Sequence, residues 1–479
     1  MRPNRRLVVG LLGAALLALG CTTSLKPGPN LGTIYDRAAR FGDLYRNPII
    51  VMPGVLGTVL RDAESQRVVW GSFAGTYANP DFGPDARLVA LPMAEGQALS
   101  TLTDEVQPDG VLESVTVSLL GLPVEQHAYI SILRTLGAGG YRDQQLAEAG
   151  AIDYGTDHFT CFQFAYDWRR DNIENAQRLH AFILEKKAFV EARLKEIYGV
   201  ERDVRFDIVA HSMGGLLSRY YLRYGARDLP ADGSAPEITW AGTEHVERLI
   251  MVGTPNAGSL DGLSNLVDGT QLAFFLPHYV PPILGTMPAI YQLLPRNRHK
   301  AVVDASGRGV DLFDPTTWER YDWGLMAEEA DATLQVLLPD ESSKEARRRV
   351  AREHLAKSLR RAQRFHAALD RPAAPPAHTS LHLFSGDAVQ TAARMQVDAE
   401  GALTLVESDA GDSRVLRTSA VMDERVGRDR WEPGLETPIA WSDVNFVFSD
   451  HLAMTRDPSF SDNLLWRLLD APKREPNAP

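Results

Sequence analysis

Residues 205–215 read Arg205-Phe206-Asp207-Ile208-Val209-Ala210-His211-Ser212-Met213-Gly214-Gly215, and this stretch decides the fold. The run up to Ala210 predicts a buried strand, and the apolar residues from Leu216 to Tyr224 predict a helix. Between them, a serine with small neighbours fits the sharp strand-to-helix turn that lifts a nucleophile above a sheet. The simpler alternative is a serine in an ordinary turn, and the context on both sides argues against it. We therefore predict Ser212 as nucleophile and the backbone amide of Met213 as one oxyanion donor.

The flanking sequence predicts a doubly wound, mainly parallel α/β sheet. Apolar runs at 49–52 and 245–252 indicate further buried strands, and 380–384 alternates like a strand. Residues 173–198 and 341–370 have helical spacing. Strands that alternate with helices form βαβ units with a parallel sheet. Regular alternation is lost between about 260 and 378, which predicts an inserted helical cap.

Changes in composition and the Pro- and Gly-rich stretches divide the chain into five parts. We expect a signal peptide at 1–21, a polar tether at 22–46, the first part of the α/β core at 47–259, the cap insertion at 260–378, and the second part of the core at 379–472.

The N-terminus resembles a bacterial lipoprotein signal. Arginines at positions 2, 5 and 6 precede an uncharged stretch, 7–20, that is too short to span a bilayer. It ends in Leu17-Ala18-Leu19-Gly20-Cys21, which predicts lipidation of Cys21. A plain secretory signal with a chance cysteine is the alternative. The resemblance implies a lipid-anchored protein of the bacterial cell envelope. Thr22, rather than an aspartate, follows the cysteine, and similarity to sorted lipoproteins then favours the outer membrane, facing the periplasm.

Composition excludes some classes of function. The 479 residues carry a net charge of −12, and nucleic-acid binding needs a basic surface. Of the two cysteines, lipidation uses Cys21, so Cys161 is left without an internal disulfide partner. Metal-ligand clusters and glycine-rich phosphate loops are absent from the sequence, so we expect no cofactor and no metal. We infer no protein partner.

A nucleophilic serine needs a histidine that takes its proton, an acid that orients this histidine, and a second oxyanion donor. The loop Met52-Pro53-Gly54-Val55 follows the first strand, where the second oxyanion donor is expected, and the Val55 amide is our candidate. A simple Pro-Gly turn is the alternative. His451 stands out among the late histidines because 447–452 follows a hydrophobic stretch and enters a loop. For the acid that orients the histidine, Asp387 and Asp412 are both candidates, and spacing does not choose between them.

Six segments together resemble the lecithin:cholesterol acyltransferase and phospholipid:diacylglycerol acyltransferase family. In order, they are Val51–Gly57, Val69–Phe73, Tyr166–Arg169, Ala210–Gly215, Gly253–Pro255 and Asp450–Leu452. The resemblance implies an α/β-hydrolase fold and a Ser-Asp-His triad. It favours Asp412, because Gly411-Asp412-Ser413-Arg414-Val415 is similar to the segment that holds the family's acid, with Asp387 as the alternative. The disulfide that closes the lid in eukaryotic members cannot form here, so segments 70–135 and 260–300 are the lid candidates.

The function that this resemblance implies is O-acyl transfer through an acyl-enzyme. The donor is expected to be a phospholipid or acylglycerol, and the acceptor an alcohol or water. One alternative is a lipase, phospholipase or carboxylesterase that uses water alone. Another is a lipoprotein that binds without catalysis, because a fold does not guarantee a function.

Overall fold

The computed structural model describes residues 28–41, 44–71, 77–112, 114–119, 122–127, 129–271 and 277–471, and of residues 114–127 only the backbone. The strands are β1 (Ile49–Met52), β2 (Thr58–Asp62), β3 (Val68–Trp70), β4 (Val106–Val111), β5 (Ser114–Leu119), β6 (Leu122–His127), β7 (Cys161–Gln163), β8 (Phe206–His211), β9 (Val246–Val252), β10 (Val302–Val303), β11 (Ser380–Gly386), β12 (Val389–Val397), β13 (Leu403–Gly411) and β14 (Asp443–Val447).

The α-helices are α2 (Leu31–Ile34), α3 (Asp36–Arg40), α4 (Gly83–Val89), α5 (Ile130–Ala138), α6 (Gln144–Glu148), α7 (Asn172–Tyr198), α8 (Met213–Tyr224), α9 (Leu260–Asp268), α10 (Pro281–Leu284), α11 (Pro288–Tyr291), α12 (Pro315–Arg320), α13 (Ala330–Leu337), α14 (Lys344–Leu369), α15 (Arg417–Val421) and α16 (Pro458–Leu465). Short 3₁₀ turns are η1 (Leu99–Thr101), η2 (Ala241–Glu244), η3 (Asn297–His299), η4 (Gly324–Met326) and η5 (Ala453–Arg456), and η6 (Trp466–Asp470) is a π-helical turn.

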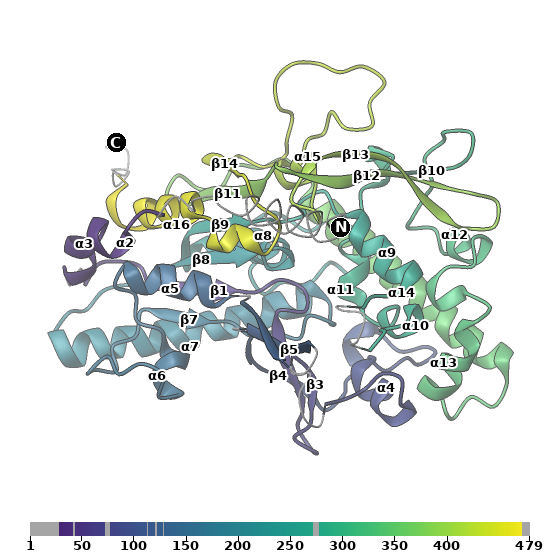
Figure 1. Ribbon diagram of the computed structural model, residues 1–479, viewed down its shortest axis with the longest axis horizontal. Helices are drawn as coiled ribbons and strands as arrows, with labels where there is room; N and C mark the ends of the chain where they lie inside the picture. The colour runs from purple at the N-terminus through teal and green to yellow at the C-terminus, as the bar shows by residue number, and fades with distance from the viewer. Residues whose placement is uncertain are drawn as a thin grey trace, which may run out of the picture.

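A six-stranded sheet forms the centre of the molecule, in the order β14-β11-β9-β8-β1-β7 (Figure 1). All five pairings in it are parallel. The chain runs from β1 outward to the edge strand β7 and then crosses back to β8. Loops that follow β1 and β8 therefore leave the sheet side by side at its switch point, which is where open α/β sheets bind ligands. The predicted α/β fold class is confirmed.

Successive side chains of each central strand enter different hydrophobic clusters, as the pleat requires. Ile50 and Met52 of β1 belong to the cluster that includes residues of α7 and α8, whereas Ile49 and Val51 belong to the cluster with α5 and α16. Because both faces are covered, β1 and β8 are buried along their whole length. This burial explains why their sequences read as continuous apolar runs.

Segment 260–378, predicted as a cap, holds α9 to α14 and β10, which lie together on the right of Figure 1. Helix α4, from the first half of the chain, contacts α13 there. The short strand β10 pairs with β12, so the cap and the second part of the core share a small sheet. The domain boundaries from the sequence remain a prediction.

Part of segment 22–46, which the sequence predicts as a tether, is helical. Within 22–46, helices α2 and α3 already pack against the core, and Tyr35 between them is buried. The Tyr35 hydroxyl donates to the backbone carbonyl of Asp462 at 2.9 Å and to its carboxylate at 2.8 Å. Helices are therefore present before Asn47, and a contact with α16, more than 400 residues away, stabilises these two helices, which are too short to form alone.

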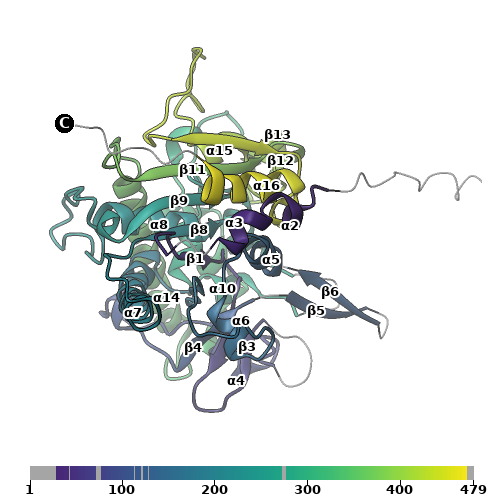
Figure 2. The same ribbon diagram turned by 90° about the vertical axis from the view of Figure 1, so that its left-hand side faces the viewer.

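The β5–β6 hairpin projects from the body on the right of Figure 2. Its foot at Leu112 donates a backbone hydrogen bond to Gly57, in the loop after β1. In the described part of the chain, no helix is both long and apolar enough to cross a membrane. The predicted signal peptide and Cys21 lie outside the described residues.

Candidate active site

Ser212 occupies a sharp turn between β8 and α8. Its backbone has φ +52° and ψ −125°, and its amide donates to the carbonyl of Val252 at 2.8 Å. Such backbone conformations cost on the order of 1–3 kcal/mol and persist where the surroundings enforce them. The loop after β1 passes so close that a Cβ on Gly54 would lie 2.7 Å from the Ser212 Cβ. Only glycine fits at position 54.

Three predicted residues from distant parts of the chain meet at this turn. The Ser212 hydroxyl donates to Nε2 of His451 at 3.0 Å, and Nδ1 of His451 donates to the Asp412 carboxylate at 2.7 Å. Ser212 is 7% exposed and Asp412 is fully buried. The arrangement matches that of a serine, its general base and the acid that fixes the base's tautomer.

Backbone amides hold the Asp412 carboxylate in place. Its second oxygen accepts from the amides of Arg414 at 3.0 Å and Val415 at 2.7 Å. The His451 amide also donates to the Asp412 carbonyl at 2.8 Å. Burial alone would raise the pKa of this carboxyl, but His451 and the two amides outweigh burial and hold the pKa below its ordinary value. Asp412 is therefore an anion next to His451.

The alternative acid, Asp387, does not contact His451. It follows β11, and its carboxylate lies 3.4 Å from Arg417. The β12–β13 hairpin leaves the sheet just after Asp387 and brings the chain back at Asp412. There, a Cβ on Gly386 would lie 2.6 Å from the Asp412 Cβ. Both aspartates thus reach the same edge of the sheet, which explains why sequence spacing did not separate them.

The two candidate oxyanion donors lie on the two loops that meet at Ser212. Met213 is the first residue of α8, where an amide has no acceptor within its own helix. The Val55 amide has no hydrogen-bond acceptor among the described residues, whereas its neighbour Gly54 donates to the Tyr129 hydroxyl at 2.8 Å. The Tyr166 hydroxyl donates to the Pro53 carbonyl at 2.9 Å and thereby fixes the loop after β1.

The Asp167–Arg169 pair, which the sequence suggested is scaffold, is fully buried. Arg169 also donates to Asp104 and to the backbone carbonyls of Leu88 and Val89. These contacts attach the loop after β7 to the segment around α4. They do not reach Ser212.

Sequence reasoning missed His211 and Tyr129. His211 is buried next to Ser212 and bonds to the Tyr129 hydroxyl and the His451 backbone. Tyr129 lies 82 positions away along the chain, so no local pattern connects the two. The only available signal was the histidine inside the nucleophile motif itself.

A second group of contacting Ser, His and Asp side chains shows that these three residue types in contact do not by themselves identify a catalytic site. His382 lies 2.6 Å from the Asp443 carboxylate and 2.9 Å from the Ser380 hydroxyl. Ser380 is the first residue of β11, at the opposite edge of the sheet from Ser212, and Arg467 binds the same Asp443 at 2.8 Å. This serine lies in a strand without a helix N-terminus behind it. The turn at Ser212 therefore distinguishes the candidate site.

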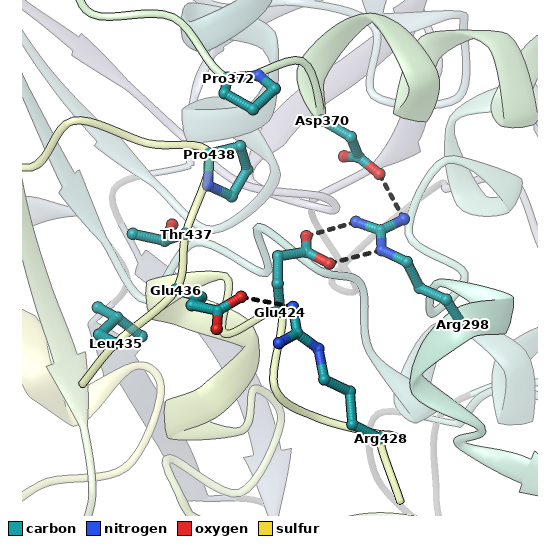
Figure 3. A pocket seen from close by; sticks show the side chains of 9 residues that line it. All are labelled: Arg298, Asp370, Pro372, Glu424, Arg428, Leu435, Glu436, Thr437 and Pro438. Carbon is teal, nitrogen blue, oxygen red and sulfur yellow. Dashed lines mark hydrogen bonds and ion pairs between the residues drawn. The ribbon is translucent and has the colours of Figure 1, made fainter. Parts of the chain in front are cut away.

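An open hollow of about 520 Å³ lies between the end of α14 and segment 424–438 (Figure 3). Its charged side chains pair with one another: Arg298 with Asp370 and Glu424, and Arg428 with Glu436. No residue of the Ser212 group lines it. We assign it no role in the chemistry at Ser212.

Within the described residues, no group of three or more His, Cys, Asp or Glu side chains is arranged to hold a metal ion. Cys161 is buried in β7 with a free thiol, and burial raises its pKa well above the ordinary value. A protonated, inaccessible thiol is a poor nucleophile.

Residues 143–335 match the family described as lecithin:cholesterol acyltransferase. This match confirms the resemblance that the sequence motifs indicated. No curated protein matches the chain.

Solved structures with a similar fold include a chain of the Tle4–Tli4 complex. It is 15% identical, with 89% of this chain and 99% of that chain covered and a TM-score of 0.55. Bacillus licheniformis lipase BlEst2 in its mature form is 12% identical, with 89% and 93% covered and a TM-score of 0.30. Lipase 1 from Pelosinus fermentans is 12% identical, with 89% and 100% covered and a TM-score of 0.32. At 15% identity, the likeness to the chain of the Tle4–Tli4 complex concerns the fold alone.

Proposed function

Because residues 143–335 match the lecithin:cholesterol acyltransferase family, we propose that this chain is an O-acyltransferase or hydrolase of lipid esters with Ser212 as nucleophile. The observation that supports it most is the Ser212–His451–Asp412 chain of hydrogen bonds at the strand-to-helix turn. The donor in this proposal is a phospholipid or acylglycerol. The acceptor is an alcohol or water.

The first half of the reaction forms an acyl-enzyme. Nε2 of His451 takes the Ser212 proton while the serine oxygen attacks the ester carbonyl. The negative charge on the former carbonyl oxygen is stabilised by the amides of Val55 and Met213. His451 then gives its proton to the leaving alcohol, and the acyl group stays on Ser212 as an ester. Asp412 stays ionised and stabilises the imidazolium.

The second half runs the same steps with a new oxygen. His451 takes a proton from the incoming alcohol or water, that oxygen attacks the acyl-enzyme, and the proton returns to Ser212. Transfer and hydrolysis share one intermediate, so the exclusion of water at the acyl-enzyme stage decides between them.

A fluorophosphonate probe tests the nucleophile. We expect wild type to be labelled at Ser212, Ser212→Ala not to be labelled, and Ser380→Ala to be labelled like wild type. The last variant is a matched control, because Ser380 has its own histidine and aspartate neighbours. Absence of labelling in wild type, or equal labelling of Ser212→Ala, would favour a binding protein without catalysis.

Mass spectrometry of the products tests the substrate class. Phospholipid vesicles are incubated with enzyme, with and without a long-chain alcohol or sterol. A new ester of the added alcohol supports acyl transfer, and free fatty acid alone supports a phospholipase. Turnover of short soluble esters without turnover of vesicles would indicate a carboxylesterase instead.

We further propose that Cys21 is lipidated and holds the protein at the bacterial cell envelope. A Cβ on Gly28, the first described residue, would lie 3.4 Å from Pro458 of α16. Gly28 follows Cys21 by seven positions, so this length of chain reaches at most about 25 Å from Gly28 even when fully extended. Pro458 follows His451 by seven positions. Loss of palmitate labelling in Cys21→Ser is the expected result, and retained labelling contradicts the anchor.

A further inference from the structure

A buried chain of hydrogen bonds runs next to the Ser212 site. The Gly54 amide donates to the Tyr129 hydroxyl at 2.8 Å, and this hydroxyl lies 3.1 Å from Nδ1 of His211. Nε2 of His211 lies 3.0 Å from the backbone carbonyl of His451. A carbonyl only accepts, so Nε2 of the neutral His211 carries the proton. Nδ1 is then the acceptor, and the Tyr129 hydroxyl donates to it.

These three bonds connect four separate segments. Gly54 lies in the loop after β1, Tyr129 precedes α5, His211 ends β8, and His451 lies in the loop after β14. One end of the chain is the peptide next to the Val55 amide. The other end is the backbone of the general base. The geometry of both is thus fixed by the same side chains.

We propose that Tyr129 and His211 are positioning residues for the reaction at Ser212. They hold the loop that bears the Val55 amide at a set distance from His451, independently of the cap. This inference rests on the proposed function, because it assigns roles to groups that act through Val55 and His451.

The surroundings suit this role. Burial and the nearby His451 lower the pKa of His211 to about 3, and burial raises the pKa of Tyr129 above its ordinary value. Both groups therefore keep one protonation state while His451 gains and loses a proton. The ring centres of His211 and His451 are 4.7 Å apart, so a charged His211 would oppose the imidazolium that catalysis requires.

The loop has no room to shift freely. A Cβ on Gly57 would lie 2.7 Å from both Cε2 and the hydroxyl oxygen of Tyr129, so the ring packs directly on the loop's backbone. Removing only the hydroxyl, as in Tyr129→Phe, keeps this packing. The same change breaks both of the hydrogen bonds that the hydroxyl makes.

The experiment compares Tyr129→Phe with Tyr221→Phe. The Tyr221 hydroxyl also lies next to a histidine nitrogen, 3.2 Å from Nδ1 of His180, and Tyr221 is also buried. It faces α7 and has no bond to the Ser212 group. The kcat and KM for a soluble p-nitrophenyl ester are measured per site titrated with fluorophosphonate, and thermal midpoints are recorded for both.

We expect Tyr129→Phe to lower kcat per titrated site by about ten- to a hundredfold with KM changed less than about threefold, because misplacing an oxyanion donor acts on the transition state. Tyr221→Phe should lower the thermal midpoint comparably and keep kcat within about twofold. Equal kcat per titrated site in the two variants would overturn the proposal and leave Tyr129 a structural residue.

A second pair tests His211 even where Tyr129→Phe does not fold. The side-chain amide of His211→Gln can donate to the His451 carbonyl, whereas His211→Ala cannot. A higher kcat per titrated site in the glutamine variant is expected, and equal values contradict the proposal. A wild type that neither reacts with the probe nor turns over ester refutes the proposed function as well. An active wild type with unaffected variants refutes this inference alone.

Discussion

Ser212, His451 and Asp412 come from the ends of three different segments, and glycines let them approach. Gly253, just after β9, has φ +60°, and a Cβ there would lie 3.1 Å from the His451 imidazole and 3.2 Å from the Asp412 carboxylate. A side chain at this position would therefore push the base away from its acid.

Gly253→Ala tests this close approach. Gly199 is a matched control, because it has φ +67° and no atom within 4 Å of an added Cβ. Both alanine variants should lose about 1–2 kcal/mol of unfolding free energy from the backbone conformation. Only Gly253→Ala should lose activity, by about tenfold or more for a displaced base. Urea unfolding and kcat for a soluble ester measure the two effects. Equal kcat losses would contradict the steric argument.

Asp412→Asn tests the identity of the acid. An asparagine amide facing Nδ1 of His451 favours the wrong tautomer, so kcat should fall by about ten-thousandfold. Asp387→Asn removes a carboxylate whose partner is Arg417, and kcat should change less than about threefold. The kcat values for a soluble ester rank the two aspartates. A greater loss in Asp387→Asn would reverse the assignment.

At the residue scale, short contiguous motifs were sufficient to predict some of the candidate site residues. Ser212 lies in a contiguous motif, and the resemblance selected Asp412. Tyr129 was missed because its bond to His211 forms only when distant segments meet. The choice between Asp387 and Asp412 depends on the hairpin between them, which no spacing rule describes.

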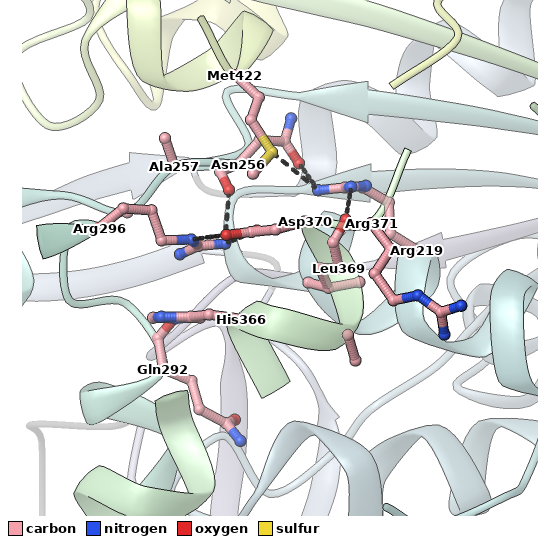
Figure 4. A network of polar contacts seen from close by, with 12 residues as sticks. Arg219, Asn256, Ala257, Gln292, Arg296, His366, Leu369, Asp370, Arg371 and Met422 are labelled. Atoms are coloured by element: carbon pink, nitrogen blue, oxygen red, sulfur yellow. Dashed lines mark hydrogen bonds and ion pairs between the residues drawn. The ribbon is translucent and has the colours of Figure 1, made fainter. Parts of the chain in front are cut away.

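At the element scale, helices α8 and α14 are joined by buried arginines (Figure 4). Arg219 of α8 donates to the Leu369 carbonyl at the end of α14 and to the Asn256 side chain, each at 2.9 Å. One turn later, Arg223 donates to the Arg371 carbonyl at 2.6 Å. Asp370 is bound instead by Arg296. These bonds satisfy the terminal carbonyls of α14 and fix the cap to the helix behind Ser212.

Arg219→Met should destabilise the protein by about 2–4 kcal/mol, because it leaves the Leu369 carbonyl and the Asn256 oxygen buried without donors. Arg349→Met is the control. Arg349 of α14 pairs with Glu95 at the surface, where more than half of the arginine and half of the glutamate side chain are exposed, so the cost should stay below about 1 kcal/mol. Urea unfolding measures both. Similar losses would show that the buried arginine has no special role.

Elements were predicted well where burial gives a periodic pattern. Strands β1, β8 and β9 and helices α7 and α14 lie close to their predicted ranges, because two-sided burial or an amphipathic face marks them in sequence. Hairpin β12–β13 was missed, because β13 is exposed along most of its length and has no alternating pattern. Helices α2 and α3 were missed because a tertiary contact stabilises them.

On the scale of the whole molecule, three of the buried histidines have a pKa far below the ordinary value. The pKa of His211 and that of His366 are lowered to about 3, and that of His354 to about 4, in each case mainly by burial. An exposed histidine has a pKa near 6.5, so between about pH 4 and 6.5 the unfolded chain binds protons that the folded chain does not. These histidines therefore destabilise the fold as the pH falls through this window, whereas buried carboxyls with a raised pKa, such as Asp207, act in the opposite direction above about pH 4.

Each of these three histidines contributes a loss of about 1.4 kcal/mol per pH unit well below pH 6.5, or roughly 4 kcal/mol per unit from the three together. Carboxylates with a lowered pKa, such as Asp412, add their effect only below about pH 4.

Urea unfolding at pH 7, 6 and 5 measures the slope of the unfolding free energy against pH. In His366→Gln the slope should decrease by about 1.4 kcal/mol per unit, since the glutamine amide can donate to the Gln292 carbonyl without titrating. An unchanged slope would mean that groups other than the buried histidines govern unfolding in acid.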